Sequence, residues 1–103
     1  MGEPRIFQEM TSPELAAAID AGDVVVIPVG SIEQHGPHLP VDTDIRLPVN
    51  TALAAARQRD YLIVAPPVSW GLSGNHTGFA GYHTLRSSTF MALLHDLCTS
   101  LID

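Results

Sequence analysis

Two short stretches of apolar, mostly β-branched residues predict the strands of this chain. Residues 23–29 include Val24-Val25-Val26-Ile27, and residues 61–65 include Leu62-Ile63-Val64. Continuous runs of this kind are typical of strands that are buried on both faces, in parallel sheets covered by helices on each side. We therefore expect two buried strands, and an irregular segment over residues 1–10, where no such pattern occurs.

Three further stretches carry apolar residues at helical spacing. The first helix is expected to begin at Thr11, whose spacing to Glu14 fits a capping box, and to end near residues 21–23. The second is expected over residues 44–59, and the third from Ser87 or Ser88 onward. The apolar face of the third comprises Phe90, Leu94, Leu97 and Leu101, with Cys98 expected as a small buried residue beside it.

The order of these elements is helix, strand, helix, strand, helix. A strand–helix–strand unit implies a right-handed crossover and a parallel sheet, so we expect an α/β fold. The two longest loops, residues 30–43 and 68–86, follow the carboxyl ends of the strands, where open α/β sheets place their sites. These loops contain His35, His38, His76 and His83.

Composition narrows the class of protein further. The chain has 103 residues, which is the size of one domain, and a formal net charge of −6. Such an acidic chain has no electrostatic footprint for nucleic acid or anionic membranes. It has no apolar run of the roughly 20 residues that a membrane-spanning helix needs, and no signal-like start. We therefore expect a cytoplasmic protein with no nucleic-acid or membrane partner.

The first long loop contains residue types that bind metals. Glu33 and His35 project to the same side of an extended chain, and Pro37 and Pro40 turn the chain back so that Asp44 can return to the same place. Two carboxylates and an imidazole that converge on one point suit Zn²⁺ or Mn²⁺.

The same residues also have a purely structural interpretation. Asp44, Asp42 or Thr43 could each serve as the N-cap of the second helix. The two prolines could simply stiffen the loop. The spacing of these residues leaves both interpretations open.

Two segments resemble a known family. The stretch PVGSIEQHGPHLP, residues 28–40, followed by Thr43-Asp44, closely resembles the signature of the creatininase (creatinine amidohydrolase) family. Residues 71–84, GLSGNHTGFAGYHT, resemble the family's Gly-x-Ser…His…Phe-Pro-Gly-Thr region more loosely. Ala80 stands in place of the proline there, and Tyr82-His83 precede the threonine. The resemblance extends over residues 10–103.

The resemblance implies a three-layer αβα fold with a mostly parallel sheet, and hydrolysis of C–N bonds in amides. It implies two divalent ions, Zn²⁺ or Mn²⁺ with Fe²⁺ as a further option. Glu33 would bind one ion, His35 the other, and Asp44 both, with a metal-bridged water as nucleophile. Residues expected to support these ligands or contact the substrate are Gln34, His38, Ser73 and His76.

Three classes of substrate are compatible with the resemblance: a cyclic amide such as creatinine, a formamide, or the end of a peptide. Of these, we expect a cyclic amide or a formamide. The sequence itself does not distinguish among the three.

The ligand set of this chain is incomplete by the standard of that family. Its members draw further ligands and a catalytic histidine from later segments, and no Gly-His-Gly-like segment occurs here. Residues 1–103 therefore resemble the N-terminal portion of a single creatininase-like domain, and we expect the catalytic residues beyond Asp103. A complementary C-terminal segment or second chain, and a homo- or hetero-oligomer, are expected partners. The competing hypothesis is a non-catalytic metal-binding or assembly subunit that completes a partner chain's site.

Overall fold

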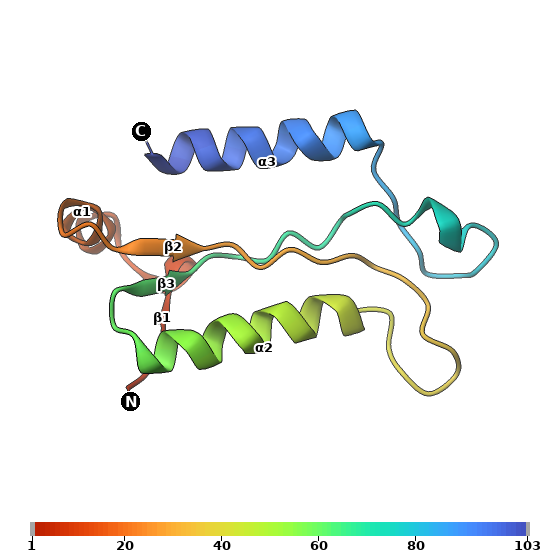
Figure 1. The fold of residues 1–103 in the computed structure, drawn as a ribbon, viewed down its shortest axis with the longest axis horizontal. Coiled ribbons are helices and arrows are strands. Elements are labelled where there is room, and N and C mark those ends of the chain that lie inside the picture. The colour runs from red at the N-terminus through yellow and green to blue at the C-terminus, as the bar shows by residue number, and fades with distance from the viewer. Residues whose placement is uncertain (1, 103) are drawn as a thin grey trace.

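The computed structural model describes residues 2–102 and contains a parallel three-stranded sheet (Figure 1). Its strands are β1 (Arg5–Ile6), β2 (Val24–Val26) and β3 (Leu62–Val64), in the order β1-β3-β2. The expectation of an irregular segment over residues 1–10 is wrong, because it contains β1. Two residues are too few for a periodic signal, and only pairing with the distant β3 makes this segment a strand.

Three α-helices connect and cover the strands. They are α1 (Ser12–Asp20), α2 (Thr43–Gln58) and α3 (Ser87–Ile102), with short 3-10 helices η1 (Phe7–Glu9) and η2 (Gly74–His76). The capping box predicted for α1 is confirmed. The Thr11 amide donates to Glu14 Oε1 at 2.8 Å, and the Glu14 amide donates to Thr11 Oγ1 at 3.3 Å.

The side chains of the sheet alternate between two helical layers, as the pleat requires. Val26 and Val64 pack against Ala52 and Ala56 of α2. On the other face, Ile27 lines a cavity with α3, and Val25 and Ile63 line one with residues of α1 and α3. Figure 1 shows α2 and α3 on opposite sides of the sheet. The αβα arrangement is therefore confirmed.

Two expectations about burial need correction. Strand β3 is central and buried, with Ile63 2% and Val64 3% exposed, but β2 is not buried on both faces. Among the described residues β2 pairs only with β3, so it lies at an edge, and Val24 is 47% exposed. Cys98 is exposed on α3 rather than buried, because the apolar stripe of this helix does not extend to it.

No helix within residues 2–102 combines the length and the apolar character needed to cross a membrane.

Candidate metal and substrate site

The two long loops lie side by side beyond the carboxyl ends of β2 and β3. The Gly30 amide donates to the Val68 carbonyl at 2.8 Å, and the Val68 amide donates to the Pro28 carbonyl at 2.8 Å. Further along, Ile32 forms a backbone bridge with His83. The pairing of β2 and β3 thus continues into the loops, which brings residues 30–35 close to residues 71–84.

Gly30 allows the start of α2 to approach the end of β2. A Cβ atom at this position would collide with the backbone carbonyl of Asp44. A Cβ at Gly71 would lie 2.8 Å from the Gly30 carbonyl oxygen. Both glycines lie in the segments that resemble the family, and their missing side chains permit the contact between the first loop, the second loop and α2.

The first loop folds back on itself, as the two prolines predict. The Glu33 amide donates to the Val41 carbonyl at 3.1 Å. At the turn, Gln34 Oε1 accepts a hydrogen bond of 2.9 Å from the Gly36 amide, and Gly36 adopts a left-handed φ of 71° that favours glycine. Gln34 therefore holds the turn that returns the chain to Asp44.

The structure separates the two roles that the sequence left open for the aspartates at the start of α2. Asp42 occupies the N-cap position, where it makes no capping hydrogen bond and instead accepts bonds of 2.9 and 2.8 Å from Arg46 Nε. Asp44 lies inside the first turn, and its carboxylate faces His35. Asp44 is thus not the cap of the helix.

His35 and Asp44 form the first polar pair of the site. His35 Nε2 lies 3.3 Å from Asp44 Oδ1, and His35 Nδ1 lies 3.0 Å from the Glu33 carbonyl oxygen. Because a carbonyl only accepts hydrogen bonds, this contact assigns the proton of a neutral ring to Nδ1. The Nε2 lone pair then faces a carboxylate oxygen. Two acceptors at this distance are compatible only when a proton or a metal cation lies between them.

Glu33 and His76 form the second pair. His76 Nε2 lies 3.7 Å from Glu33 Oε1, and both side chains are mostly buried, at 19% and 17% exposure. His76 Nδ1 is buried and has no hydrogen-bond partner among the described residues. An unpartnered buried nitrogen is costly, so this ring marks a position where a further polar group would be stabilising.

These four side chains do not converge on one point. Within residues 2–102 no three His, Cys, Asp or Glu side chains are spaced to hold a single ion.

Ser73 is fully buried, its amide donates to Thr84 Oγ1 at 2.9 Å, and its hydroxyl has no partner in the described part of the chain. His38 is exposed, with its ring against Gly36. Thr84 is a contact that the sequence did not indicate.

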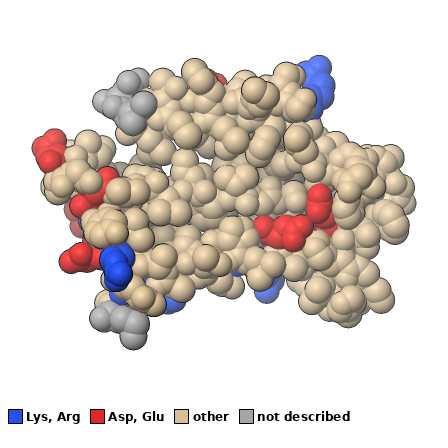
Figure 2. Space-filling model, viewed as in Figure 1, with Lys and Arg blue, Asp and Glu red and all other residues tan. Residues whose placement is uncertain are grey.

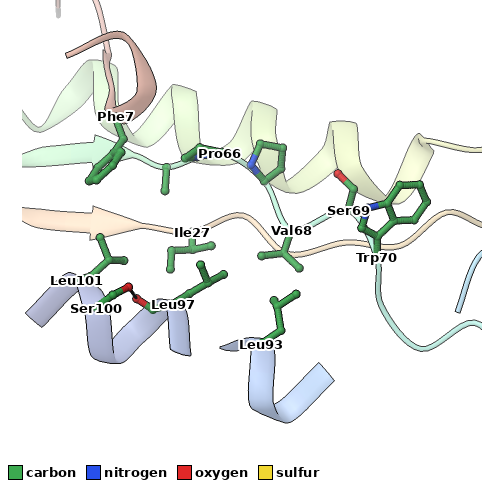
Figure 3. Close-up of a pocket in the computed structure, with 12 residues that line it drawn as sticks. Phe7, Ile27, Pro66, Val68, Ser69, Trp70, Leu93, Leu97, Ser100 and Leu101 are labelled. Carbon is green, nitrogen blue, oxygen red and sulfur yellow. Dashed lines mark hydrogen bonds between the residues drawn. The ribbon is translucent and has the colours of Figure 1, made fainter. Parts of the chain in front are cut away.

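A large apolar cavity is separate from this polar site. It has a volume of about 560 Å³ and lies between α3 and the sheet, where Ile27, Val68, Leu93 and Leu97 point into it (Figure 3). The acidic side chains, in contrast, lie away from this apolar cavity. Figure 2 shows a group of acidic atoms surrounded by uncharged surface, in the half of the molecule that carries the loops.

Comparison with known proteins assigns the chain and its fold to a family. The family model described as creatinine amidohydrolase matches residues 8–103. The chain belongs to the creatininase family. The mycofactocin precursor peptide peptidase of Mycolicibacterium smegmatis is 46% identical over 77 residues, which are 69% of this chain and 31% of that protein. The creatinine amidohydrolase of Pseudomonas putida is 32% identical over 99 residues, 90% of this chain and 38% of that protein.

Solved creatininase structures agree with this assignment. A variant creatininase of zinc–zinc type superposes with a TM-score of 0.86 at 30% identity, and covers 97% of this chain and 41% of that one. A manganese form of creatininase superposes with a TM-score of 0.87 and covers 96% of this chain. The creatininase-like chain described here thus spans about a third to two fifths of the length of the relatives it matches.

Proposed function

We propose that this chain forms part of a metal-dependent hydrolase that cleaves a C–N amide bond. Two divalent ions, Zn²⁺ or Mn²⁺ with Fe²⁺ as a further option, would be held in part by Glu33, His35 and Asp44. The observation that carries this proposal is the contact between His35 Nε2 and Asp44 Oδ1, because a metal ion, like a proton, would be stabilised between their facing lone pairs. Imidazole and carboxylate together suit zinc and manganese better than calcium.

Each side chain has a role that follows from its position. The Glu33 carbonyl orients the His35 ring and keeps Nε2 available as a ligand, which is the usual way in which a metal-binding histidine is oriented. Asp44 lies in the first turn of α2, where the helix dipole stabilises a carboxylate. Divalent ions, when bound, acidify water and stabilise the negative charge that develops on an amide oxygen.

The second loop supplies the side chains expected to contact a substrate or support a ligand. His76 lies beside Glu33, and Ser73 and His76 each have a buried polar atom without a partner in the described residues. The substrate class that the relatives favour is a peptide, because the 46% identical mycobacterial relative is named as a peptide peptidase. We therefore place a peptide C–N bond ahead of a cyclic amide or a formamide.

The catalytic unit would extend beyond these residues. Solved relatives more than twice as long share this fold, and the four polar side chains here form two pairs rather than a complete ligand group. A complementary segment or second chain would supply the remaining ligands and the catalytic residues. Residues 1–103 would then be the N-terminal portion of one domain, within a cytoplasmic oligomer.

A second function is favoured by the division of the site into two pairs. A chain that only holds part of a ligand set could serve as a non-catalytic metal-binding subunit that completes a partner's site. This hypothesis shares the metal ligands with the first and differs in whether the completed site hydrolyses amides.

Metal affinity tests the proposed ligands. The chain is titrated with Zn²⁺ and Mn²⁺ in competition with a chromophoric chelator, as are the variants His35→Asn and Asp44→Asn. Matched controls are His95→Asn, at an exposed residue of α3, and Asp42→Asn, which loses only the contact to Arg46. We expect weak binding that falls at least about tenfold in the two site variants and stays unchanged in the controls.

Equal affinity in all four variants would contradict the ligand assignment.

An assay of amide hydrolysis distinguishes the hydrolase from the non-catalytic metal-binding subunit. The chain alone should not hydrolyse amides, and a completed site should. A completed site that binds metal without hydrolysis would support the subunit hypothesis, whereas full activity of the chain alone would exclude the need for a further segment.

A further inference from the structure

The apolar cavity between α3 and the sheet is elongated. On the helix side it is lined by Leu93, Leu97 and Leu101, which lie on a single face of α3 (Figure 3). Leu93 and Leu101 are eight residues apart, which corresponds to about 12 Å of helix. Phe7 lies toward one end of the cavity and Trp70 toward the other. The volume of about 560 Å³ therefore extends along the helix between two aromatic side chains.

The wall that the sheet contributes is rigid. Pro66 and Pro67 both line the cavity, and the ring of each proline fixes its backbone. Val68 follows them and is 8% exposed. Its amide donates to the Pro28 carbonyl and its carbonyl accepts from the Gly30 amide, both at 2.8 Å. Because this wall is fixed by prolines and by hydrogen bonds, the sheet side of the cavity is preformed.

The lining of the cavity carries no charge. Every residue that lines it within residues 2–102 is uncharged, and Ser69 and Ser100 contribute the hydroxyl groups. The Ser100 hydroxyl donates to the Leu97 carbonyl of its own helix at 3.0 Å. No polar atom of the lining is both buried and without a partner among the described residues. Burial of hydrocarbon is favourable in such a space, whereas burial of a charge or of an unpaired polar group is costly.

Trp70 lies where the cavity reaches the second loop. Its side chain is 46% exposed and makes an edge contact with the ring of His83, with the ring centroids 4.7 Å apart. A backbone bridge between His83 and Ile32 joins the second loop to the first at this point. The indole is thus supported at the end of the cavity, where it offers an aromatic surface to an entering molecule.

We propose that this cavity binds a small, uncharged and elongated hydrocarbon molecule. Since a cavity of about 150 Å³ accommodates benzene, one of about 560 Å³ holds up to about 20 carbon atoms. Small-molecule sites of about 300–1,000 Å³ are mostly lined by apolar and aromatic side chains, as this one is. A polypeptide segment is a poorer occupant, because its amides and carbonyls need hydrogen-bond partners that the lining does not supply. The site is independent of the proposed metal ligands.

Fluorescence tests the binding site directly, because Trp70 is the only tryptophan of the chain. The full chain is titrated in a buffer with EDTA with phenylnaphthylamine, an uncharged and elongated aromatic dye. We expect saturable one-to-one binding with energy transfer from Trp70 to the dye. Decanol, an uncharged alkyl molecule, should displace the dye and reverse the transfer.

A matched pair of variants places the bound dye. Ala65→Leu enlarges a side chain of the cavity lining, and Ala92→Leu adds the same atoms at an exposed residue of α3. We expect affinity for the dye to fall at least about tenfold in Ala65→Leu and to stay unchanged in Ala92→Leu. Circular dichroism verifies that both variants are folded.

NMR of the unaltered chain gives a second measurement that needs no variant. The methyl signals of Ile27, Leu93 and Leu97, which point into the cavity, should shift when the dye or decanol binds. The methyl signals of Leu53, which packs against the core on the α2 face, should stay in place.

Absence of dye binding, equal affinity in the two variants, or shifts at Leu53 as large as those at Leu97 would overturn the proposal. Binding that weakens as the concentration of the chain rises would also overturn it, since a second copy would then occupy the cavity. So would displacement of the dye by a polypeptide that contains the part of the Mycolicibacterium smegmatis relative outside its match to this chain. Because EDTA is present throughout, these results and the metal titration of His35 and Asp44 can fail separately.

Discussion

The two faces of the sheet are packed differently, although both are apolar. On the α2 face, Ala52, Ala56 and Val64 are 7%, 5% and 3% exposed and form a contiguous core. On the α3 face a cavity of about 560 Å³ separates the helix from the sheet, and Leu97, which lines it, is 37% exposed. The small side chains of α2 let its backbone approach the sheet, whereas the leucines of α3 hold that helix farther away.

The difference shows that the α2 face of the sheet forms a closely packed core, whereas the α3 face does not. Helix α2 connects two strands that are both present, and its first turn carries Asp44 to the site. Helix α3 covers the sheet beside β2, whose outer edge has no partner among the described residues. The loosely packed α3 face and the unpaired edge of β2 thus adjoin each other among the described residues.

We expect the largest difference between the two faces when a buried alanine is replaced by a larger side chain. Ala56→Leu forces a larger side chain into the close contact between α2 and Val64, and we expect a loss of up to about 3 kcal/mol in the free energy of unfolding. The matched change Ala65→Leu adds the same atoms at a residue that lines the α3 cavity, and should stay within about 0.5 kcal/mol. Urea denaturation measures both. Equal losses would show that the cavity is not available space.

Removed volume gives the converse comparison. Val64→Ala deletes two buried methyl groups from the α2 face, and we expect a loss of about 2 kcal/mol. Leu97→Ala deletes more atoms, but that side chain is 37% exposed beside an existing cavity, so its cost should be about 1 kcal/mol. The same denaturation experiment applies. A larger loss for Leu97→Ala would mean that α3 contributes as much to the core as α2.

The smallest effect is local to the start of α1 and independent of either face. The hydrogen bond from the Thr11 backbone amide, and then that with the Thr11 side chain, lowers the pKa of Glu14 below its ordinary value of 4.5. The Glu14 carboxyl therefore binds a proton more readily in the unfolded chain than in the folded one. Its hydrogen bonds stabilise the folded state above about pH 4.5, and this stabilisation is lost as the pH falls through the lowered pKa. Glu14→Gln should remove this dependence in unfolding curves measured from about pH 5 to pH 3. Parallel pH profiles for both proteins would contradict the capping assignment.

The sequence predicts most of the secondary structure because the signals are local. The Thr11–Glu14 spacing, the valine run and the stripe of α2 each act within a few residues, and all three elements were found. Strand β1 gave no such signal, since Arg5 and Ile6 pair with residues nearly sixty positions away. The burial expected for β2 was wrong for a related reason, because burial depends on which strands flank it.

Local pattern also determined the candidate site: the family signature, the fold-back of the first loop at its prolines, and the return of Asp44 were all readable from residues 28–44. Only the tertiary structure decided how the polar groups pair. It placed His35 against Asp44, and it placed Glu33 against His76, which lies in a loop more than forty residues away. Side-chain spacing along a chain specifies neighbours within a turn or strand. Contacts between loops depend instead on the parallel pairing of β2 with β3 and on Gly30, where the absence of a Cβ lets α2 approach.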